Sequence, residues 1–209
     1  SALSSPRRLD LRAAPDVQAV DHGGQAGLTR AMSFASRLTR HPIPFSTARG
    51  DEGWAALHGV DLALRPLITG AAGSSPYLSA LILREADWLS DALQATPDDT
   101  IAALIAEAAR LDHATLDRGL RQLKRRAALV VALADLGGLW PLHRVTQAWT
   151  DFADACLKAA LITHVGLEAR RGKIPGMTEQ DAESFGAGMV ALAMGKMGAG
   201  ELNYSSDID

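Results

Sequence analysis

The chain has 209 residues, of which 47% are hydrophobic and 22% are charged, as in a globular protein with a sizeable core. Its net charge of −3 argues against a general nucleic-acid binder, because phosphate contacts require an excess of basic residues. The sequence has no apolar stretch typical of a membrane span or a secretory signal, and its single cysteine, Cys156, excludes an intrachain disulfide and is expected to be a buried apolar residue. We therefore expect a cytoplasmic protein with no membrane partner.

The N-terminal third alternates helical patterns with breaks. Residues 1–23 contain prolines and glycines and are predicted to form an irregular leader. Apolar residues at helical spacing predict helices over about 25–39 and 51–64, separated by the two prolines in 41–45. The Gly- and Ser-rich stretch 68–77 is predicted to be a loop.

The middle of the chain is predicted to be almost entirely helical, and its helices have recognisable ends. The predicted helices cover residues 76–93 with Ser75 as N-cap, residues 97–111 with Thr96 as N-cap, residues 113–137 ending at Gly137–Gly138, and residues 142–170. Together, residues 24–184 are predicted to form one helical domain.

The pattern changes after Phe185. Met189, Val190, Leu192 and Met194 fit a buried strand bounded by glycines, and a turn and a second extended segment are predicted to follow. The fold class is therefore predicted to be mainly α, a helical bundle that leads, in residues 185–209, into the first strands of a truncated α+β domain.

Two aspartates, Asp207 and Asp209, stand one residue apart in this last segment. On a strand their carboxylates point to the same face, where they repel each other unless a cation lies between them. Mg²⁺ suits such a pair, since it prefers oxygen ligands and is usually held by one or two carboxylates together with substrate phosphates. Gly195 and Gly198 leave backbone amides open to phosphate oxygens. The alternative interpretation of the two aspartates is a solvated acidic turn.

The whole segment "GKMGAGELNYSSDID" resembles the signature of the nucleotidyltransferase superfamily, although Lys196 stands where that signature has Gly or Ser. It resembles more closely the core motif of the bifunctional glutamine synthetase adenylyltransferase/adenylyl-removing enzymes. Two upstream stretches, Ser74–Leu89 and Leu120–Leu161, are also similar to that family. The "ELNYSSDID" form is most like the family's first, adenylyl-removing copy of the motif.

The resemblance implies an enzyme that removes AMP from a tyrosine of glutamine synthetase by phosphorolysis, and adds AMP from ATP through a second domain. It implies glutamine synthetase and the PII signalling protein as partners, and ATP, ADP and phosphate as ligands. A third carboxylate normally comes from a later strand, so the chain alone is expected to be inactive. The implied site residues are Asp207 and Asp209 as catalytic ligands of Mg²⁺ or Mn²⁺, and Gly195, Lys196, Gly198, Ser205 and Ser206 as phosphate or nucleotide contacts.

Two other functions remain open: a helical protein-interaction module, and a different metal-dependent nucleotidyltransferase. The remaining polar and aromatic features favour structural roles. The basic run 118–126 is predicted to be a solvated helix face, and the histidines at 113, 143 and 164 lack metal-site spacing. The four tryptophans are predicted to pack between helices.

Overall fold

The structure, a computed structural model, describes residues 33–204 and 206. The described part is mainly α-helical, as the sequence predicts, and the predicted leader 1–23 lies outside it. Its α-helices are α1 (Thr47–Ala55), α2 (Arg65–Ser74), α3 (Pro76–Arg84), α4 (Ala86–Ala92), α5 (Pro97–Ala108), α6 (Leu116–Leu136), α7 (Leu142–Arg170), α8 (Glu179–Phe185) and α9 (Gly195–Ala199).

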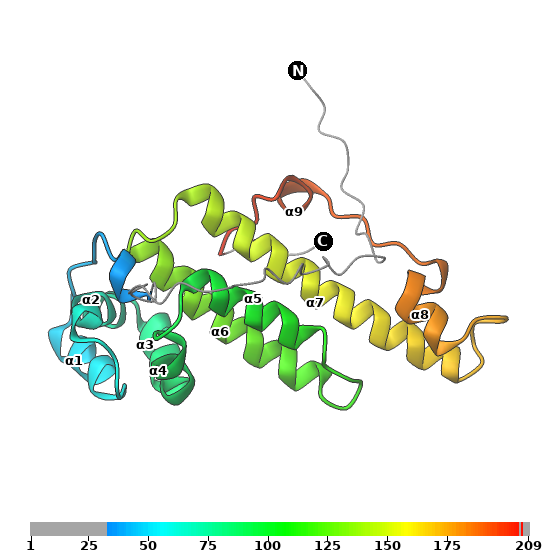
Figure 1. The fold of residues 1–209 in the computed structure, drawn as a ribbon, viewed down its shortest axis with the longest axis horizontal. Helices are drawn as coiled ribbons and strands as arrows, with labels where there is room; N and C mark the ends of the chain where they lie inside the picture. The colour runs from blue at the N-terminus through cyan, green and yellow to red at the C-terminus, as the bar shows by residue number, and fades with distance from the viewer. Residues whose placement is uncertain (1–32, 205, 207–209) are drawn as a thin grey trace, which may run out of the picture.

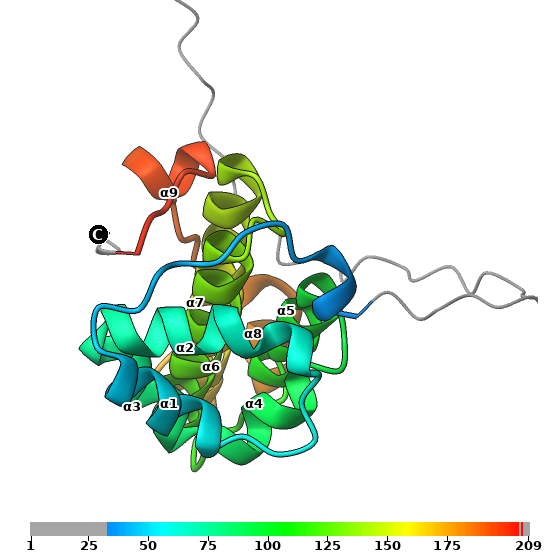
Figure 2. The ribbon, with the colours of Figure 1, turned by 90° about the vertical axis from the view of Figure 1, so that its left-hand side faces the viewer.

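The two long helices, α6 and α7, run along the length of the molecule, and the shorter helices are arranged around them (Figure 1). Helices α1 to α4 gather at one end, and α8 packs against the opposite end of α7. Helix α9 lies alongside the first half of α7, on the side away from α5 (Figures 1 and 2). The core runs through this arrangement, and Leu129 and Leu133 of α6 are fully buried in it.

Local signals in the sequence locate several helix ends correctly. Ser75 caps α3, its Oγ accepting a hydrogen bond from the Leu78 N–H at 3.2 Å, and Thr96 caps α5 in the same way through the Asp99 N–H at 3.1 Å. Helix α6 ends at Gly137, and α7 covers 142–170 as predicted. These signals are short-range, so they are readable from neighbouring residues alone.

The prediction of a loop over 68–77 is wrong, because most of this stretch belongs to α2. Its glycines lie where α2 meets other backbone segments too closely for a side chain. A Cβ on Gly73 would lie 2.7 Å from the Ser46 carbonyl oxygen, and Gly50 and Gly53 of α1 make similarly close approaches to α2. The glycines therefore serve close packing and do not mark a turn.

The helix predicted over 25–39 is wrong in its described part, where only Ala35–Arg37 form a short 3-10 helix. The backbone here is engaged with other elements instead: the Phe34 N–H donates to the Ala95 carbonyl at 3.0 Å, and the N–H groups of Thr39 and Arg40 donate to the Gly137 carbonyl. The helix predicted over 51–64 is also shorter than expected, since α1 ends at Ala55.

The single helix predicted over 76–93 is divided into α3 and α4 at Glu85. This residue is 6% exposed, and its two carboxylate oxygens accept hydrogen bonds from Arg125 Nε at 2.8 Å and Arg126 Nε at 3.0 Å. The Arg126 guanidinium also lies over the Trp88 ring, 5.0 Å from its centroid. The prediction of a solvated face for the basic run 118–126 is therefore wrong for Arg125 and Arg126, which form a half-buried clamp on Glu85.

The pKa of Glu85 reflects this clamp. Burial alone would raise it, but the hydrogen bonds and positive charges of Arg125 and Arg126 outweigh burial and lower the pKa below its ordinary value. The carboxylate is therefore ionised in the folded protein and ties α6 to the α3–α4 break.

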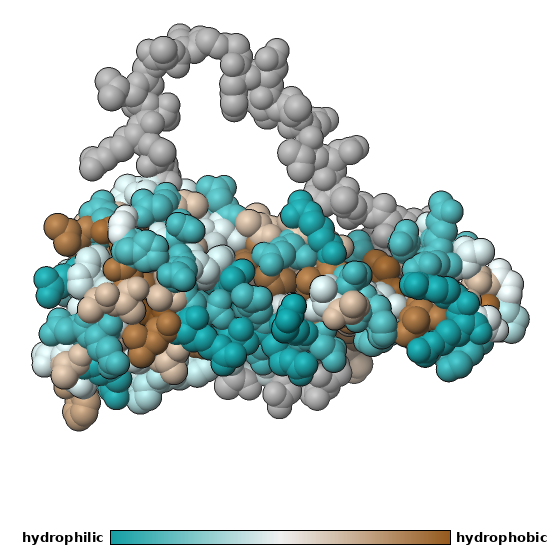
Figure 3. Space-filling model, turned by 90° about the horizontal axis from the view of Figure 1, so that it is seen from below, coloured by the Kyte–Doolittle hydropathy of each residue, from teal (hydrophilic) through white to brown (hydrophobic). Residues whose placement is uncertain are grey.

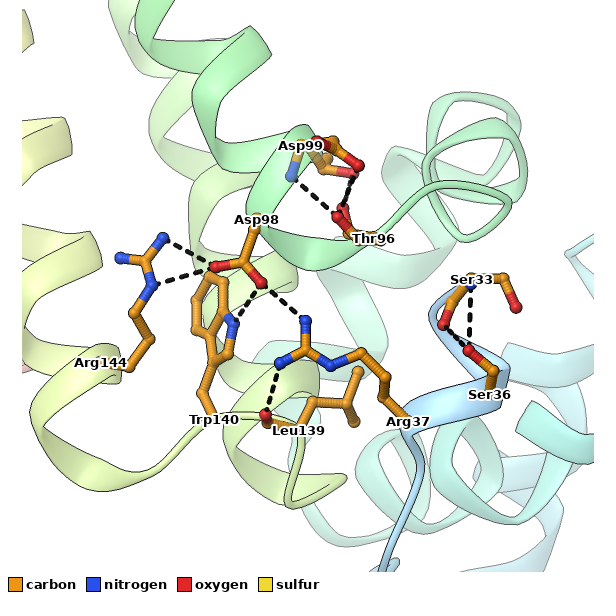
Figure 4. Close-up of polar contacts among 10 residues, drawn as sticks. Ser33, Ser36, Arg37, Thr96, Asp98, Asp99, Leu139, Trp140 and Arg144 are labelled. Atoms are coloured by element: carbon orange, nitrogen blue, oxygen red, sulfur yellow. Dashed lines mark hydrogen bonds and ion pairs between the residues drawn. The ribbon is translucent and has the colours of Figure 1, made fainter. Parts of the chain in front are cut away.

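A second carboxylate cluster joins three elements around Asp98, in the first turn of α5 (Figure 4). Asp98 accepts hydrogen bonds from Arg37 Nη1 at 2.8 Å, Trp140 Nε1 at 3.2 Å and Arg144 Nε at 3.1 Å. Arg37 also donates to the Leu139 carbonyl at 3.3 Å, and Arg144 lies 4.7 Å from the Trp140 ring centroid. This Asp98 cluster fixes the α6–α7 connection to α5 and to the segment before α1.

The strand predicted for Met189–Met194 is not present among the described residues. Within this segment only Leu192 forms an isolated β-bridge, and Met189, Val190, Leu192 and Met194 are at least half exposed rather than buried. A strand requires a neighbouring strand for its backbone hydrogen bonds, and the other predicted strand falls largely on Asp207–Asp209, outside the described residues.

Hydrophilic residues cover most of the face seen from below, and the hydrophobic residues there form separate patches (Figure 3). None of the described helices combines the length and the apolar character needed to cross a membrane. The amphipathic helices instead turn their apolar sides toward the shared core.

The Gly50→Ala substitution is expected to destabilise the fold by about 1–3 kcal/mol, because the new methyl group would lie 2.6 Å from the Thr69 carbonyl oxygen of α2. Gly166→Ala on α7 is the matched control: its Cβ would meet only ordinary contacts, and it should be neutral or stabilising by up to about 1 kcal/mol. Urea unfolding measures both free energies, and equal effects would contradict the close-packing role of Gly50.

The Glu85→Gln substitution is expected to cost about 2–4 kcal/mol at neutral pH, because two arginines lose their charged partner in a mostly buried position. Since the folded-state pKa is lowered, the contribution of the ionised Glu85 is present above the unfolded pKa of about 4.3 and is lost as pH falls through the folded pKa. The difference between wild type and variant should therefore shrink in acid.

Glu107→Gln on the exposed face of α5 is the control for this charge change, with an expected effect within about 0.5 kcal/mol. Chemical denaturation at several pH values measures the free energy of unfolding for all three proteins. A pH-independent difference between wild type and Glu85→Gln would refute the assignment.

Candidate functional site

The segment from Met194 to Ser206 contains most of the predicted site residues that the structure describes. The predicted glycine-rich turn is a short helix, α9, which begins at Gly195 with φ of 55° and is followed by Gly200 with φ of 74°, both in the left-handed region. Gly198 faces the Ala193 carbonyl oxygen so closely that no side chain fits there. All three glycines of the motif thus have a conformational or packing requirement.

Helix α9 is anchored on the helical core by apolar side chains. Ala193, Met197 and Leu202 are between 5% and 8% exposed and belong to the main hydrophobic cluster. The apolar residues between them and α8 are largely exposed, as described above. The glycine-rich segment therefore has a defined position on α7, although it contributes no strand among the described residues.

Leu202 and Tyr204 join the segment after α9 to the long helices through hydrogen bonds. The Leu202 N–H donates to Thr150 Oγ1 of α7 at 3.2 Å, in a buried position. The Tyr204 hydroxyl lies 3.3 Å from Asp135 Oδ2 and 3.3 Å from the Val131 carbonyl oxygen, both on α6. Burial and the Asp135 carboxylate raise the pKa of the Tyr204 hydroxyl, so it is a neutral donor.

Asn203 and Ser206 form a small turn immediately before the predicted metal ligands. Ser206 Oγ donates to Asn203 Oδ1 at 2.8 Å and accepts from the Asn203 N–H at 3.3 Å, and the Ser206 N–H donates to the Asn203 carbonyl at 3.2 Å. The Ser206 hydroxyl thus has a structural function in this structure. Asn203 shapes the turn through its side-chain and backbone contacts with Ser206.

The predicted phosphate contacts Gly195, Lys196 and Gly198 are brought together on α9, but the Gly198 N–H is not open as predicted, because it donates to the Met194 carbonyl at 3.1 Å. Lys196 is exposed, and its amine has no hydrogen bond or ion pair with any described residue, so it is accessible to an anion. Ser205, Asp207 and Asp209 lie outside the described residues, and their predicted roles stay predictions. No cluster of three or more potential His, Cys, Asp or Glu metal ligands occurs within residues 33–204 and 206.

A pocket of about 320 Å³ lies next to this segment, between α3, α6, α7 and Tyr204. Ala128 and Ala132 of α6 form part of its wall, and Lys124, whose amine pairs with no described residue, lies at its rim. Trp149 also lines it, and its ring packs edge-on against Tyr204 with 5.9 Å between centroids. The pocket is mostly apolar, and Tyr204 closes one side of it.

The sequence did not indicate Thr150, Asp135 or Tyr204 as site residues. Thr150 and Asp135 stand far from the motif in the chain, and only the fold brings them to it. Tyr204 belongs to the motif, and its position between Asn203 and the two serines could have marked it as a site residue. Its hydrogen-bond partners cannot be read from the sequence.

The contacts of the other candidate residues indicate structural roles. Cys156 is largely buried, which raises the pKa of its thiol to about 11 and makes it unreactive at neutral pH. His113 and His164 lie edge to face with 6.1 Å between ring centroids. Trp140 and Trp149 are buried in the core, as predicted.

Comparison with known proteins identifies the family to which this arrangement belongs. The family model described as glutamate-ammonia ligase adenylyltransferase matches residues 67–209, from α2 through the two aspartates. The chain belongs to this family. The resemblance inferred from the motif is thereby confirmed over most of the chain.

Curated relatives share the name bifunctional glutamine synthetase adenylyltransferase/adenylyl-removing enzyme. The protein from Bradyrhizobium diazoefficiens is 49% identical over 151 residues, which is 69% of this chain and 15% of that protein. The one from Rhodopseudomonas palustris strain BisB5 is 46% identical over 155 residues, covering 72% of this chain and 15% of its own length. The chain thus spans about 15% of the length of these relatives. No solved structure matches it significantly.

Proposed function

We propose that this chain forms part of the adenylyl-removing site of a glutamine synthetase adenylyltransferase/adenylyl-removing enzyme. One observation carries the proposal: the family match extends without a break from the helical scaffold through the Ser-Ser-Asp-x-Asp motif. In the described part, the residues before the aspartates are held on α6 and α7 by the contacts of Leu202 and Tyr204. The helices would thus present the acidic motif to a substrate.

The proposed reaction is the phosphorolysis of a tyrosyl-AMP bond on glutamine synthetase. An oxygen of inorganic phosphate attacks the phosphorus of the adenylyl group, and the bond from that phosphorus to the tyrosine oxygen breaks. The tyrosine oxygen takes up a proton, and the AMP unit leaves joined to the phosphate as ADP. The reverse direction of AMP transfer, from ATP, would belong to a different domain of the full protein.

Asp207 and Asp209 are proposed to hold one or two divalent cations, Mg²⁺ or Mn²⁺. Carboxylate oxygens are the ligands these ions prefer. Residues 203–206, directly before the pair, include no lysine or arginine that would pair with the carboxylates in place of a metal ion. A cation bound there would polarise the phosphoryl group and offset its negative charge. This chain's own residues would position the two carboxylates and bind the phosphate.

The phosphate-binding residues are proposed to be Gly195, Lys196, Gly198 and the serines 205 and 206. The support from the structure is the exposed Lys196 on α9, whose amine pairs with no described residue, together with a backbone that has no side chain at Gly195. Lysine attracts a phosphate as a point charge, so the unusual residue at this position of the motif suits the role. We also propose the PII signalling protein as a partner and the cytoplasm as the location.

The substitutions Asp207→Asn and Asp209→Asn, made in the full-length protein, are each expected to lower phosphate-dependent release of ADP from adenylylated glutamine synthetase by at least about 100-fold. The physical reason is the loss of a negatively charged ligand for the cation. Asp91→Asn, on the exposed face of α4, makes the same charge change as a control and should leave the rate unchanged. Equal rates in all four proteins would overturn the proposed function.

The 209-residue chain is expected to bind Mn²⁺ weakly alone and more tightly when ADP is present, because phosphate oxygens complete the ligand set that two carboxylates begin. Isothermal calorimetry with and without ADP measures the two affinities. Asp207→Asn should abolish the ADP-dependent gain, and the Asp91→Asn control should retain it. Tight stoichiometric Mn²⁺ binding without nucleotide would contradict an incomplete site.

A further inference from the structure

We propose that Thr150 and Tyr204 are positioning residues for the Asp207–Asp209 pair, acting by hydrogen-bonding the preceding segment to α7 and α6. This inference rests on the proposed function of the two aspartates. It extends that function to residues that do not touch the substrate. Leu202 and Tyr204 stand five and three residues before Asp207, so their positions determine where the Ser-Ser-Asp-x-Asp motif begins.

The contact through Thr150 uses both the donor and the acceptor capacity of its hydroxyl group. Thr150 is 1% exposed; its Oγ1 donates to the Thr146 carbonyl at 2.9 Å and accepts from the Leu202 N–H at 3.2 Å. The hydroxyl therefore uses its donor within α7 and its acceptor for the motif segment. A displaced segment would leave the Leu202 N–H buried without an acceptor, which is unfavourable. The contact thus favours one position of the segment along α7.

The contact through Tyr204 fixes a second point, two residues further along. Its hydroxyl has one proton and two acceptors, Asp135 Oδ2 and the Val131 carbonyl, and neither acceptor can donate in return. Asp135 is itself held by Arg40, whose Nη2 lies 3.4 Å from Oδ1 and donates to the Asp135 carbonyl at 2.8 Å. Tyr204 is therefore tied to a carboxylate that a separate part of the chain holds in place.

Two fixed points on two helices define both the location and the direction of a backbone segment. One point would leave the segment free to rotate about it, whereas two points restrain its path toward Asp207. Catalysis is sensitive to such restraint, because a misplacement of about 1 Å at the reacting groups can cost about 100-fold in rate. The expected effect of removing either hydroxyl is therefore on turnover, not on substrate binding.

The test uses Thr150→Val and Tyr204→Phe in the full-length protein, which remove the hydroxyl groups and keep the shape of the side chains. Thr100→Val is the matched control for the first: Thr100 is also buried and also donates to the carbonyl four residues earlier, at 2.9 Å, but it does not contact the motif segment. Tyr77→Phe is the control for the second, since Tyr77 lies at the rim of the same pocket with its side chain exposed.

We expect kcat for ADP release from adenylylated glutamine synthetase to fall roughly 10- to 100-fold in both variants, with KM for that substrate within about twofold of wild type. Thr150→Ser should restore the rate, because it returns the hydroxyl. Hydrogen exchange of the amides in 200–204 should accelerate at least about tenfold in Thr150→Val and remain unchanged in Thr100→Val. Both controls should keep the wild-type kcat.

Variants that match their controls in kcat and in amide exchange would overturn the proposal, as would a rise in KM with kcat unchanged. Amide exchange also separates this inference from the proposed function. If Asp207→Asn and Asp209→Asn leave ADP release intact, the proposed function fails, even where exchange shows that Thr150 holds the segment. If those two variants are inactive and Thr150→Val is fully active, only the positioning inference fails.

Discussion

The arrangement of the long helices depends most directly on the hydrogen bonds that the Asp98 carboxylate accepts. This carboxylate lies in the first turn of α5, where the unpaired backbone N–H groups of a helix favour a negative charge, and it receives three side-chain donors from two other segments (Figure 4). Burial alone would raise the pKa of Asp98, but the hydrogen bonds from Arg37, Trp140 and Arg144 outweigh burial and lower it. The carboxylate is therefore charged in the folded protein. Because Trp140 and Arg144 flank the start of α7, this one group fixes how α7 leaves α6.

The geometry of the α6–α7 pair in turn determines where the motif segment lies. Asp135 is near the end of α6 and Thr150 is two turns into α7, so both follow closely from the connection that Asp98 fixes. Arg40 extends the same framework, since the segment that supplies Arg37 to Asp98 also supplies Arg40 to Asp135. A short stretch before α1 thus contacts both the connection of the long helices and the support of Tyr204. The described residues Leu202 and Tyr204 are thus supported by residues from three separated parts of the chain.

The sequence predicts those parts of the fold that depend on neighbouring residues. The caps at Ser75 and Thr96 and the full extent of α7 are correct because a cap or an apolar period is a local property. The glycines of α2 were misinterpreted because their cause is the close approach of another segment, and the break at Glu85 was missed because its cause is a pair of arginines on α6. The strand at 189–194 has the right composition for a sheet, but a strand needs a partner that composition cannot supply.

The same distinction between local and long-range causes applies to the candidate site. Its proposed chemistry is local: two carboxylates at alternate positions, a lysine and several glycines can all be read from fifteen consecutive residues, which lie within the larger family match over 67–209. Its geometry is not local, because the Leu202 N–H finds its acceptor 52 residues earlier and the Tyr204 hydroxyl finds its acceptors 69 and 73 residues earlier. In the proposed function the motif supplies the reacting groups, and the helical scaffold positions the segment that precedes them. The helices of this chain therefore belong to the candidate site, because their hydroxyl and carboxylate groups hold Leu202 and Tyr204, which directly precede the acidic motif.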